Sequence, residues 1–176
     1  MLKRFPEKLY ETRNMKGRNK DSLEECIAKR LIKKKKTIGI AESCTGGLLS
    51  KRLTDIPGSS KYIKLNVVAY SDEAKNKLLN VPLETLKKYG AVSPQAAKLM
   101  ARGIKKLAGT NIGFSITGIA GPAGGSKKKP VGLVYFGLSD QKKVTVKKVF
   151  FGSNSTRDEI RQLAAQFALN WIKKEL

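Results

Sequence analysis

The chain of 176 residues is 40% hydrophobic, which is enough for one buried core and leaves no room for a second domain of comparable size. Its 36 Lys and Arg outnumber 14 Asp and Glu and give a formal charge of +22, which attracts nucleic acid, anionic lipid or phosphorylated small molecules. With no histidine and only two cysteines, Cys26 and Cys44, the composition excludes a disulfide framework and a typical zinc site, and it removes the commonest general base.

The first twenty residues differ in composition from the rest of the chain. They hold seven Lys and Arg against two acidic residues without a sustained apolar period, which predicts a basic extension over residues 1–20 and one domain over residues 21–176. Ser22 and Glu25 form a capping-box pattern at the start of a predicted helix of about three turns. That helix ends in the lysine run 33–36, which suits the negative end of a helix dipole.

Two predicted strands are each followed directly by a helix. Residues 37–41 are short and apolar enough for a buried strand, and residues 46–54 can form a helix after it. Residues 63–70 are predicted to form a second strand, followed by a helix over residues 71–79 with two acidic residues in its first turn. The first strand therefore delivers residues 42–47 into a tight turn.

Glycine and proline punctuate the remaining chain clearly. The elements predicted there are a short helix between Pro82 and Gly90, a helix over residues 93–108, a strand over 111–117, an irregular loop over 118–126, and a hairpin of strands 131–138 and 144–151. A final helix has an apolar stripe made of Ile160, Leu163, Ala164, Phe167, Ala168 and Trp171. Alternating strands and helices followed by a hairpin predict an α/β protein, a three-layer α/β/α sandwich with a mixed, mostly parallel sheet.

Three segments with reactive side chains or glycines follow or end predicted strands. They cover residues 42–47, 70–75 and 117–126. Ligands in open α/β sheets bind beyond the carboxyl ends of the strands, so we expect these segments to meet at one cleft.

The turn over residues 42–47 offers Ser43 as a nucleophile. A helix that starts near Gly46 points free backbone N–H groups and a positive dipole at whatever Ser43 holds, which can stabilise an oxyanion. Helix capping by Ser43 and Thr45 explains the same residues about equally well. Cys44 is a competing nucleophile because a helix N-terminus lowers a thiol pKa, although a small buried core cysteine is the default interpretation.

Tyr70 and Lys75 are the candidates for proton transfer in a chain without histidine. They approach Ser43 if their strands are neighbours, and a partly buried lysine near another cation can lose its proton at neutral pH. The alternative is that Tyr70 packs at a strand end and that Lys75 is a solvated helix lysine. Ser-Lys or Ser-Lys-Tyr chemistry fits a hydrolase of this composition.

The loop over residues 118–126 is a candidate anion site. Successive glycines let backbone amides line a concave surface, and the lysines at 127–129 add positive charge nearby. The glycine spacing matches neither a Walker A pattern nor a dinucleotide fingerprint, which disfavours hydrolysis of nucleotide triphosphates.

The order, spacing and identity of several segments point to one family when they are taken jointly. These segments are residues 41–47, 57–60, 67–75, 90–93, 117–122 and 130–132. Over about residues 22–174 the chain resembles the C-terminal domain of the competence/damage-inducible CinA proteins, known as nicotinamide mononucleotide (NMN) deamidase. The resemblance implies an α/β/α fold and hydrolysis of the carboxamide of NMN to nicotinate mononucleotide and ammonia, without a metal or another cofactor.

The resemblance also implies roles for individual residues. Ser43 attacks the amide carbon, while Lys75 and Tyr70 manage its proton and that of the departing ammonia. The implied substrate-binding residues are Thr45, Gly46 and Gly47 for the oxyanion, Thr117, Gly118, Gly121 and Gly124 for the nucleotide and its phosphate, and Arg157 for the phosphate. About three residues are inserted ahead of Arg157 relative to the family pattern, and surface charge explains Arg157 and Arg161 equally well.

The remaining expectations concern location and partners. No run approaches the roughly 18 uncharged apolar residues of a membrane span, and the N-terminus lacks the apolar block of a signal peptide, so we expect a cytoplasmic protein without a membrane partner. The basic residues are spread along the chain, as is typical of a solvated surface, so nucleic-acid binding is not the favoured explanation of the charge. The resemblance suggests a homo-oligomer with a pyridine nucleotide as substrate. The alternative function is a nucleotide-binding module that uses the same cleft without turnover.

Overall fold

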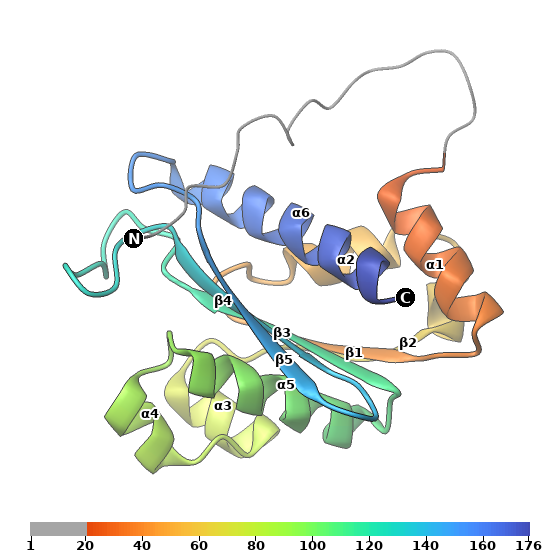
Figure 1. Cartoon of the computed structure of the whole chain (residues 1–176), viewed down its shortest axis with the longest axis horizontal. Helices are drawn as coiled ribbons and strands as arrows, with labels where there is room; N and C mark the ends of the chain where they lie inside the picture. Colours follow the sequence, from red (N-terminus) through yellow and green to blue (C-terminus); the bar gives the residue numbers. More distant parts are fainter. Residues whose placement is uncertain (1–20) are drawn as a thin grey trace.

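A five-stranded sheet forms the middle of three layers in the computed structural model, which describes residues 21–176 (Figure 1). The expected extension, residues 1–20, lies outside the described residues. One face of the sheet carries α1 (Leu23–Lys33), α2 (Leu48–Thr54) and α6 (Arg157–Glu175), and the other carries α3 (Asp72–Leu79), α4 (Leu83–Tyr89) and α5 (Pro94–Ala108). The predicted α/β/α sandwich is confirmed.

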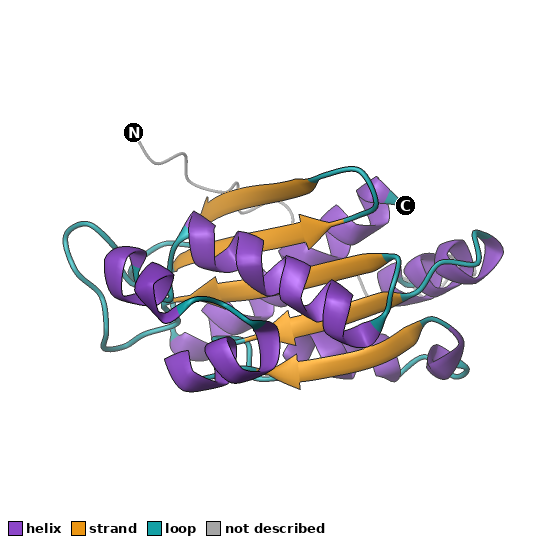
Figure 2. Cartoon of the chain, turned by 90° about the horizontal axis from the view of Figure 1, so that it is seen from below, coloured by secondary structure: helices purple, strands orange, loops and turns teal. Residues whose placement is uncertain are grey.

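The strand order is β2-β1-β3-β4-β5 (Figure 2). The strands are β1 (Ile38–Glu42), β2 (Ile63–Val68), β3 (Ile112–Gly118), β4 (Leu133–Ser139) and β5 (Val144–Phe150), and a short 3₁₀ helix, η2 (Ser59–Lys61), precedes β2. Strand β1 pairs in parallel with β2 and β3, whereas β4 is antiparallel to both β3 and β5. Strand β5 therefore runs in the same direction as β3, and only β4 is antiparallel to the other strands. The prediction of a mixed, mostly parallel sheet is confirmed.

Side-chain caps precede most of the helices within residues 21–176. The Ser22 hydroxyl accepts a hydrogen bond from the Glu25 amide at 3.1 Å, and the Glu25 carboxylate accepts one from the Ser22 amide at 2.7 Å, so the predicted capping box is formed. The helix expected over residues 46–54 begins at Leu48 instead. Gly46 and Gly47 have φ angles of +60° and +93°, which a right-handed helix does not admit.

Aromatic side chains fill the layer between the sheet and α6. Trp171 meets Phe114 edge to face with ring centroids 5.5 Å apart, and Phe167 lies 4.7 Å from Phe136 by the same measure. The predicted apolar stripe of α6 therefore packs on the sheet. On the other face, Gly137 lets α5 approach closely, because a Cβ there would overlap the carbonyl oxygen of Ala97. Within residues 21–176 no helix is long and apolar enough to cross a membrane.

Candidate active site

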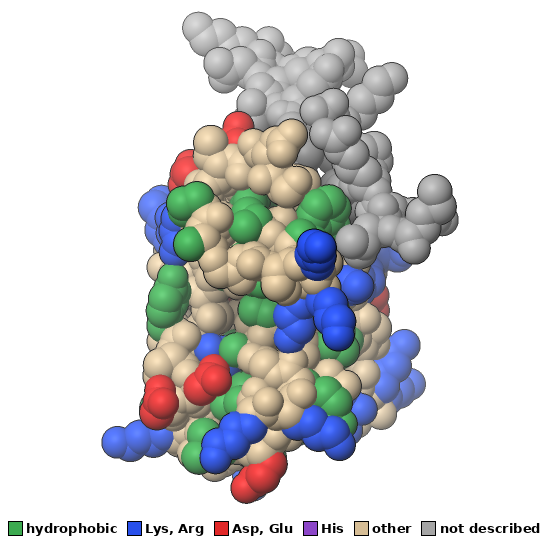
Figure 3. Space-filling view, turned by 90° about the vertical axis from the view of Figure 1, so that its left-hand side faces the viewer, with side chains coloured by type: hydrophobic (Ala, Val, Ile, Leu, Met, Phe, Trp, Pro, Cys, Tyr) green, Lys and Arg blue, Asp and Glu red, His purple; other side chains and the backbone are tan. Residues whose placement is uncertain are grey.

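The three segments with reactive groups meet at one end of the sheet. Strands β1, β2 and β3 run in parallel, so the chain that follows each of them emerges at the same edge. A pocket of about 260 Å³ lies there. The predicted site residues that line it are Ser43, Tyr70, Lys75, Thr117, Gly118, Gly121, Gly124 and Arg157. Figure 3 views the molecule from this end and shows Lys and Arg side chains around it.

Ser43 is the first residue after β1 and is only 8% exposed. Its carbonyl oxygen accepts a hydrogen bond from the Gly46 amide at 3.0 Å, which closes a turn directly after the strand. The left-handed Gly46 and Gly47 then lead into α2. The side chain of Ser43 is thereby presented at the pocket by a sharp strand-to-helix turn, the arrangement that exposes nucleophiles in many α/β hydrolases.

The N-terminus of α2 is capped by the side chain of Glu42, a role that the sequence pattern did not predict. The Glu42 carboxylate is fully buried and accepts hydrogen bonds from the amides of Gly47, Leu49 and Ser50 and from the Ser50 hydroxyl. The prediction of free amides at Gly46 and Gly47 is therefore wrong, since Gly46 is bonded to the Ser43 carbonyl and Gly47 to Glu42. Neither glycine lines the pocket. The available signal was a carboxylate a few residues before a helix that lacks a local side-chain cap.

Two amides next to Ser43 have no partner in another described residue. Within the part of the chain that the structure describes, the amides of Cys44 and Thr45 donate no hydrogen bond to another residue, and Cys44 lines the pocket. Thr45 does not, and its fully buried hydroxyl has no hydrogen-bond partner. Burial raises the pKa of the Cys44 thiol to about 12, so Cys44 is a thiol rather than the reactive thiolate at neutral pH.

Lys75 is the buried cation of the pocket, with a side chain only 1% exposed. It lies in the first turns of α3, and its Nζ donates hydrogen bonds to the carbonyl oxygens of Tyr70 at 3.0 Å and Ser71 at 3.3 Å. The Asp72 carboxylate lies 3.9 Å from the same nitrogen. Burial lowers the pKa of Lys75, and Asp72 opposes that shift. Two N–H groups of a neutral amine satisfy the two carbonyls, which leaves its lone pair free to accept a proton.

Tyr70 and Arg157 close the mouth of the pocket together. The Tyr70 side chain is 60% exposed, and its hydroxyl accepts a hydrogen bond from Arg157 Nη2 at 2.8 Å. Arg157 Nη1 donates to the carbonyl oxygen of Gly121 at 2.7 Å. The insertion ahead of α6 therefore leaves Arg157 at the pocket. Arg161 lies elsewhere, with its guanidinium bonded to the Thr45 carbonyl from outside the pocket.

The glycine-rich loop supplies the far wall of the pocket. The Thr117 hydroxyl donates to the carbonyl oxygen of Ala91 at 2.9 Å, which ties the loop to the start of α5. Within residues 21–176, the amides of Ala120, Gly121 and Gly124 donate no hydrogen bond although all three residues line the pocket. Such unpaired amides are suited to an anion. Lys129 points away, since its Nζ donates to the Tyr89 carbonyl at 2.6 Å.

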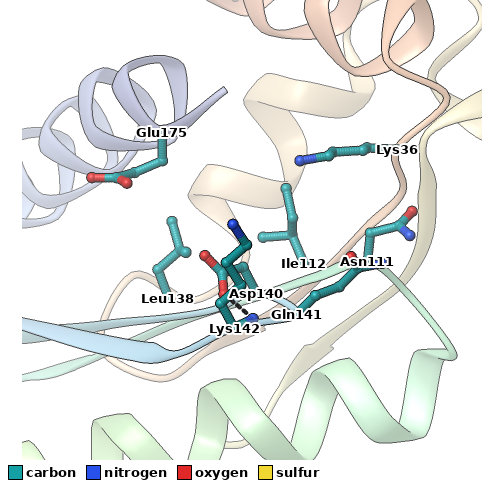
Figure 4. A pocket seen from close by; sticks show the side chains of 8 residues that line it. All are labelled: Lys36, Asn111, Ile112, Leu138, Asp140, Gln141, Lys142 and Glu175. Atoms are coloured by element: carbon teal, nitrogen blue, oxygen red, sulfur yellow. Dashed lines mark hydrogen bonds between the residues drawn. The ribbon is translucent and has the colours of Figure 1, made fainter.

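A second, smaller pocket of about 110 Å³ lies at the opposite end of the sheet, where β3 begins and β4 ends (Figure 4). Its Asp140 carboxylate is already bonded to the backbone amides of Lys142 and Lys143, and its Lys36 and Glu175 are exposed. This pocket therefore lacks a buried reactive group, and the first pocket is the candidate active site.

Fold and pocket together define an α/β/α domain with a serine at a strand-to-helix turn. The family model described as "CinA C-terminal domain" matches residues 20–176, and the chain belongs to this family. It is 51% identical over 164 residues to a CinA-like protein of Syntrophomonas wolfei and 49% identical over 174 residues to one of Kosmotoga olearia. These alignments cover 93% and 99% of this chain but only 39% and 41% of the relatives, so the chain spans about two fifths of their length.

Solved structures of the same superfamily share the fold. A CinA superfamily protein from Klebsiella pneumoniae superposes with a TM-score of 0.83 at 33% identity, over 87% of this chain and 94% of that one. The competence/damage inducible protein CihA from Agrobacterium tumefaciens gives a TM-score of 0.79 at 37% identity, over 89% and 97%.

Proposed function

We propose that this chain hydrolyses the carboxamide of NMN to nicotinate mononucleotide and ammonia, without a metal ion, with Ser43 as the nucleophile. The observation that carries the proposal is the presence of Ser43 and the buried Lys75 in one pocket, beside a loop with unpaired amides. The segments around these residues resemble NMN deamidases, which supports the choice of substrate.

Lys75 is the proton carrier in this proposal. Neutral Lys75 accepts the proton of Ser43 Oγ as that oxygen attacks the amide carbon, and it returns the proton to the nitrogen as the C–N bond breaks and ammonia leaves. Water then attacks the acyl ester: Lys75 takes a proton from the water and gives it to Ser43 Oγ as the ester C–O bond breaks, which releases nicotinate mononucleotide. Tyr70 is less suited to this role because its hydroxyl is held by Arg157 at the exposed mouth of the pocket.

The pocket must bind two negatively charged groups, the oxyanion that forms during the reaction and the phosphate of the nucleotide. The Cys44 amide, next to the nucleophile, is the oxyanion donor, and one such donor lowers the barrier by about 2.7–4 kcal/mol. The amides of Ala120 and Gly121, with the remaining N–H groups of Arg157, bind the phosphate of the nucleotide. The proposed oxyanion donor is thus the residue that follows Ser43, in place of the expected Thr45, Gly46 and Gly47.

One observation favours the alternative of a nucleotide-binding module without turnover. Within the described part of the chain, Ser43 Oγ makes no hydrogen bond, and the Lys75 Nζ is bonded to two backbone carbonyls rather than to Ser43. Catalytic contacts often tighten only when the substrate binds, which keeps this geometry compatible with catalysis.

The test is ammonia release from NMN by the pure protein, together with calorimetric binding of NMN. Ser43→Ala should lower the rate by at least about 10³-fold while the protein stays folded and still binds NMN. Ser60→Ala, a serine outside the pocket, should keep the wild-type rate. Binding without ammonia from the wild-type chain would establish the binding module, and neither binding nor ammonia would reject both functions.

A further inference from the structure

The turn that carries Ser43 is fixed from one side by the buried carboxylate of Glu42. Oε2 accepts hydrogen bonds from the amides of Gly47 at 3.1 Å and Leu49 at 3.2 Å. Oε1 accepts from the Ser50 amide at 2.8 Å and from the Ser50 hydroxyl at 2.5 Å. Glu42 has no exposed surface, so water cannot substitute for any of these four bonds.

The same turn is also held by the side chain of Arg161. Its Nη2 and Nε donate to the carbonyl oxygen of Thr45 at 3.0 Å and 3.3 Å, across the boundary between α6 and the turn. A Cβ placed on Gly46 would lie 3.4 Å from Nη2, so the guanidinium also packs against the next residue. Arg161 is itself held by α6, whose Trp171 is buried against the sheet.

A turn that contains two consecutive glycines needs contacts with other side chains to fix its conformation. Gly46 and Gly47 both adopt left-handed angles and have no side chain that would restrict them to those angles. Their conformation is therefore imposed by contacts: the Gly46 amide is bonded to the Ser43 carbonyl within the turn, and the side chains of Glu42 and Arg161 hold the Gly47 amide and the Thr45 carbonyl. Ser43 and Cys44 lie in sequence between Glu42, whose carboxylate holds the Gly47 amide, and Thr45, whose carbonyl is held by Arg161, so their direction follows from these two contacts.

We propose that Glu42 and Arg161 are positioning residues that aim the Ser43 hydroxyl and the Cys44 amide into the pocket. Neither residue lines the pocket, so neither touches the substrate. The kinetic part of this proposal rests on the proposed amidase function. A displacement of reacting atoms by about 1 Å can lower a rate on the order of 10²-fold, so loss of either contact acts on kcat rather than on binding.

The first test compares Glu42→Gln and Arg161→Ala with a matched control. Glu42→Gln keeps the shape but turns one acceptor oxygen into an NH2 group that faces at least one backbone N–H, and we expect kcat to fall on the order of 10²-fold with KM for NMN unchanged. Millimolar guanidinium should restore part of the activity of Arg161→Ala and none to Ser43→Ala. Ser115→Ala removes a buried hydrogen bond to the Ala97 carbonyl outside the pocket and should keep the wild-type kcat. If Ser115→Ala and Glu42→Gln lowered kcat equally, the losses would reflect lower stability rather than lost positioning. This result would overturn the proposal.

A second readout does not depend on turnover. Cys44 lies beside Ser43 and is buried, so its rate of reaction with an aromatic disulfide reagent reports opening of the turn. In a Cys26→Ser background, Glu42→Gln and Arg161→Ala should each raise that rate roughly tenfold or more, because hydrogen bonds to charged groups are strong. Ser115→Ala should leave it unchanged. Wild-type labelling rates in both variants would refute the positioning role, whereas absence of ammonia release from the wild type would refute only the amidase.

Discussion

Lys75 is the residue whose protonation the proposed mechanism depends on, and its neighbour Asp72 offers a way to test this. Only the neutral amine accepts a proton, so the rate rises as pH increases through the pKa of Lys75. The Asp72 carboxylate raises that pKa against the effect of burial. Asp72→Asn should therefore move the acidic limb of the kcat profile to lower pH. A limb that stays in place in a pH-rate measurement would assign the titration to another group.

The burial of Lys75 also lowers the free energy of unfolding at neutral pH. Its pKa is lower in the folded chain than the ordinary value of 10.5, so between the two values the unfolded chain binds more protons and stability rises with pH. Lys75→Met should therefore raise the free energy of unfolding at pH 7, and the gain over wild type should shrink as pH approaches 10.5. Urea unfolding at several pH values measures this difference. A constant gain across that range would contradict a depressed pKa.

A substitution at Thr45 tests whether its side chain has a structural role or the substrate-binding role that the family resemblance implies. Its buried hydroxyl lacks a partner and does not reach the pocket. Thr45→Val removes this unsatisfied group at nearly constant shape, so we expect the free energy of unfolding to rise by about 1 kcal/mol with ammonia release unchanged. Denaturant unfolding and an NMN assay give the two quantities. If Thr45→Val were more stable but no longer released ammonia, the Thr45 hydroxyl would be assigned to substrate binding.

At the scale of the elements, α6 joins the core to the site. Trp171 packs on Phe114 while the start of the helix supplies Arg157 and Arg161. Trp171→Ala should lower the free energy of unfolding by about 3–5 kcal/mol, the usual range for a buried aromatic side chain. Tyr89→Ala, a partly exposed aromatic on α4, serves as the control and should change stability far less. If both variants lowered the free energy of unfolding by similar amounts, the packing of Trp171 would contribute no more to stability than that of Tyr89.

Sequence signals predicted the elements better than the contacts between them. The Ser22 and Ser93 caps and the glycine after α5 are local patterns, and the helices follow them. The start of α2 was predicted two residues early because Gly46 and Gly47 adopt left-handed angles, and the carboxylate that caps the helix belongs to Glu42, a strand residue that no local helix rule includes. Arg161 reaches the Thr45 carbonyl across 116 positions of sequence. Such a contact depends on how α6 lies across the sheet, which local periodicity does not determine.

At the scale of the whole molecule, the parallel strands explain why three distant segments could be predicted to meet. The carboxyl ends of β1, β2 and β3 lie at one edge, so Ser43, Lys75 and Thr117 share a pocket whatever their separation in sequence. The direction of each side chain was not predictable in this way. Tyr70 and Lys75 both line the pocket, yet one is exposed and the other buried. Topology therefore predicts which residues come together, whereas burial and hydrogen bonding decide their roles.

The net charge of +22 should make the stability of the molecule depend on salt. Like charges spread over a compact chain repel one another, and raising NaCl from about 0.01 M to about 1 M shortens the Debye length from about 30 Å to about 3 Å. We expect Tm to rise, by about 2–4 °C for each 1 kcal/mol of repulsion that is screened. The control is the same titration near the isoelectric point of about 10.1, where the net charge is close to zero and the salt effect should largely disappear. An equal rise in Tm at both pH values would show that salt acts through apolar surface rather than through charge.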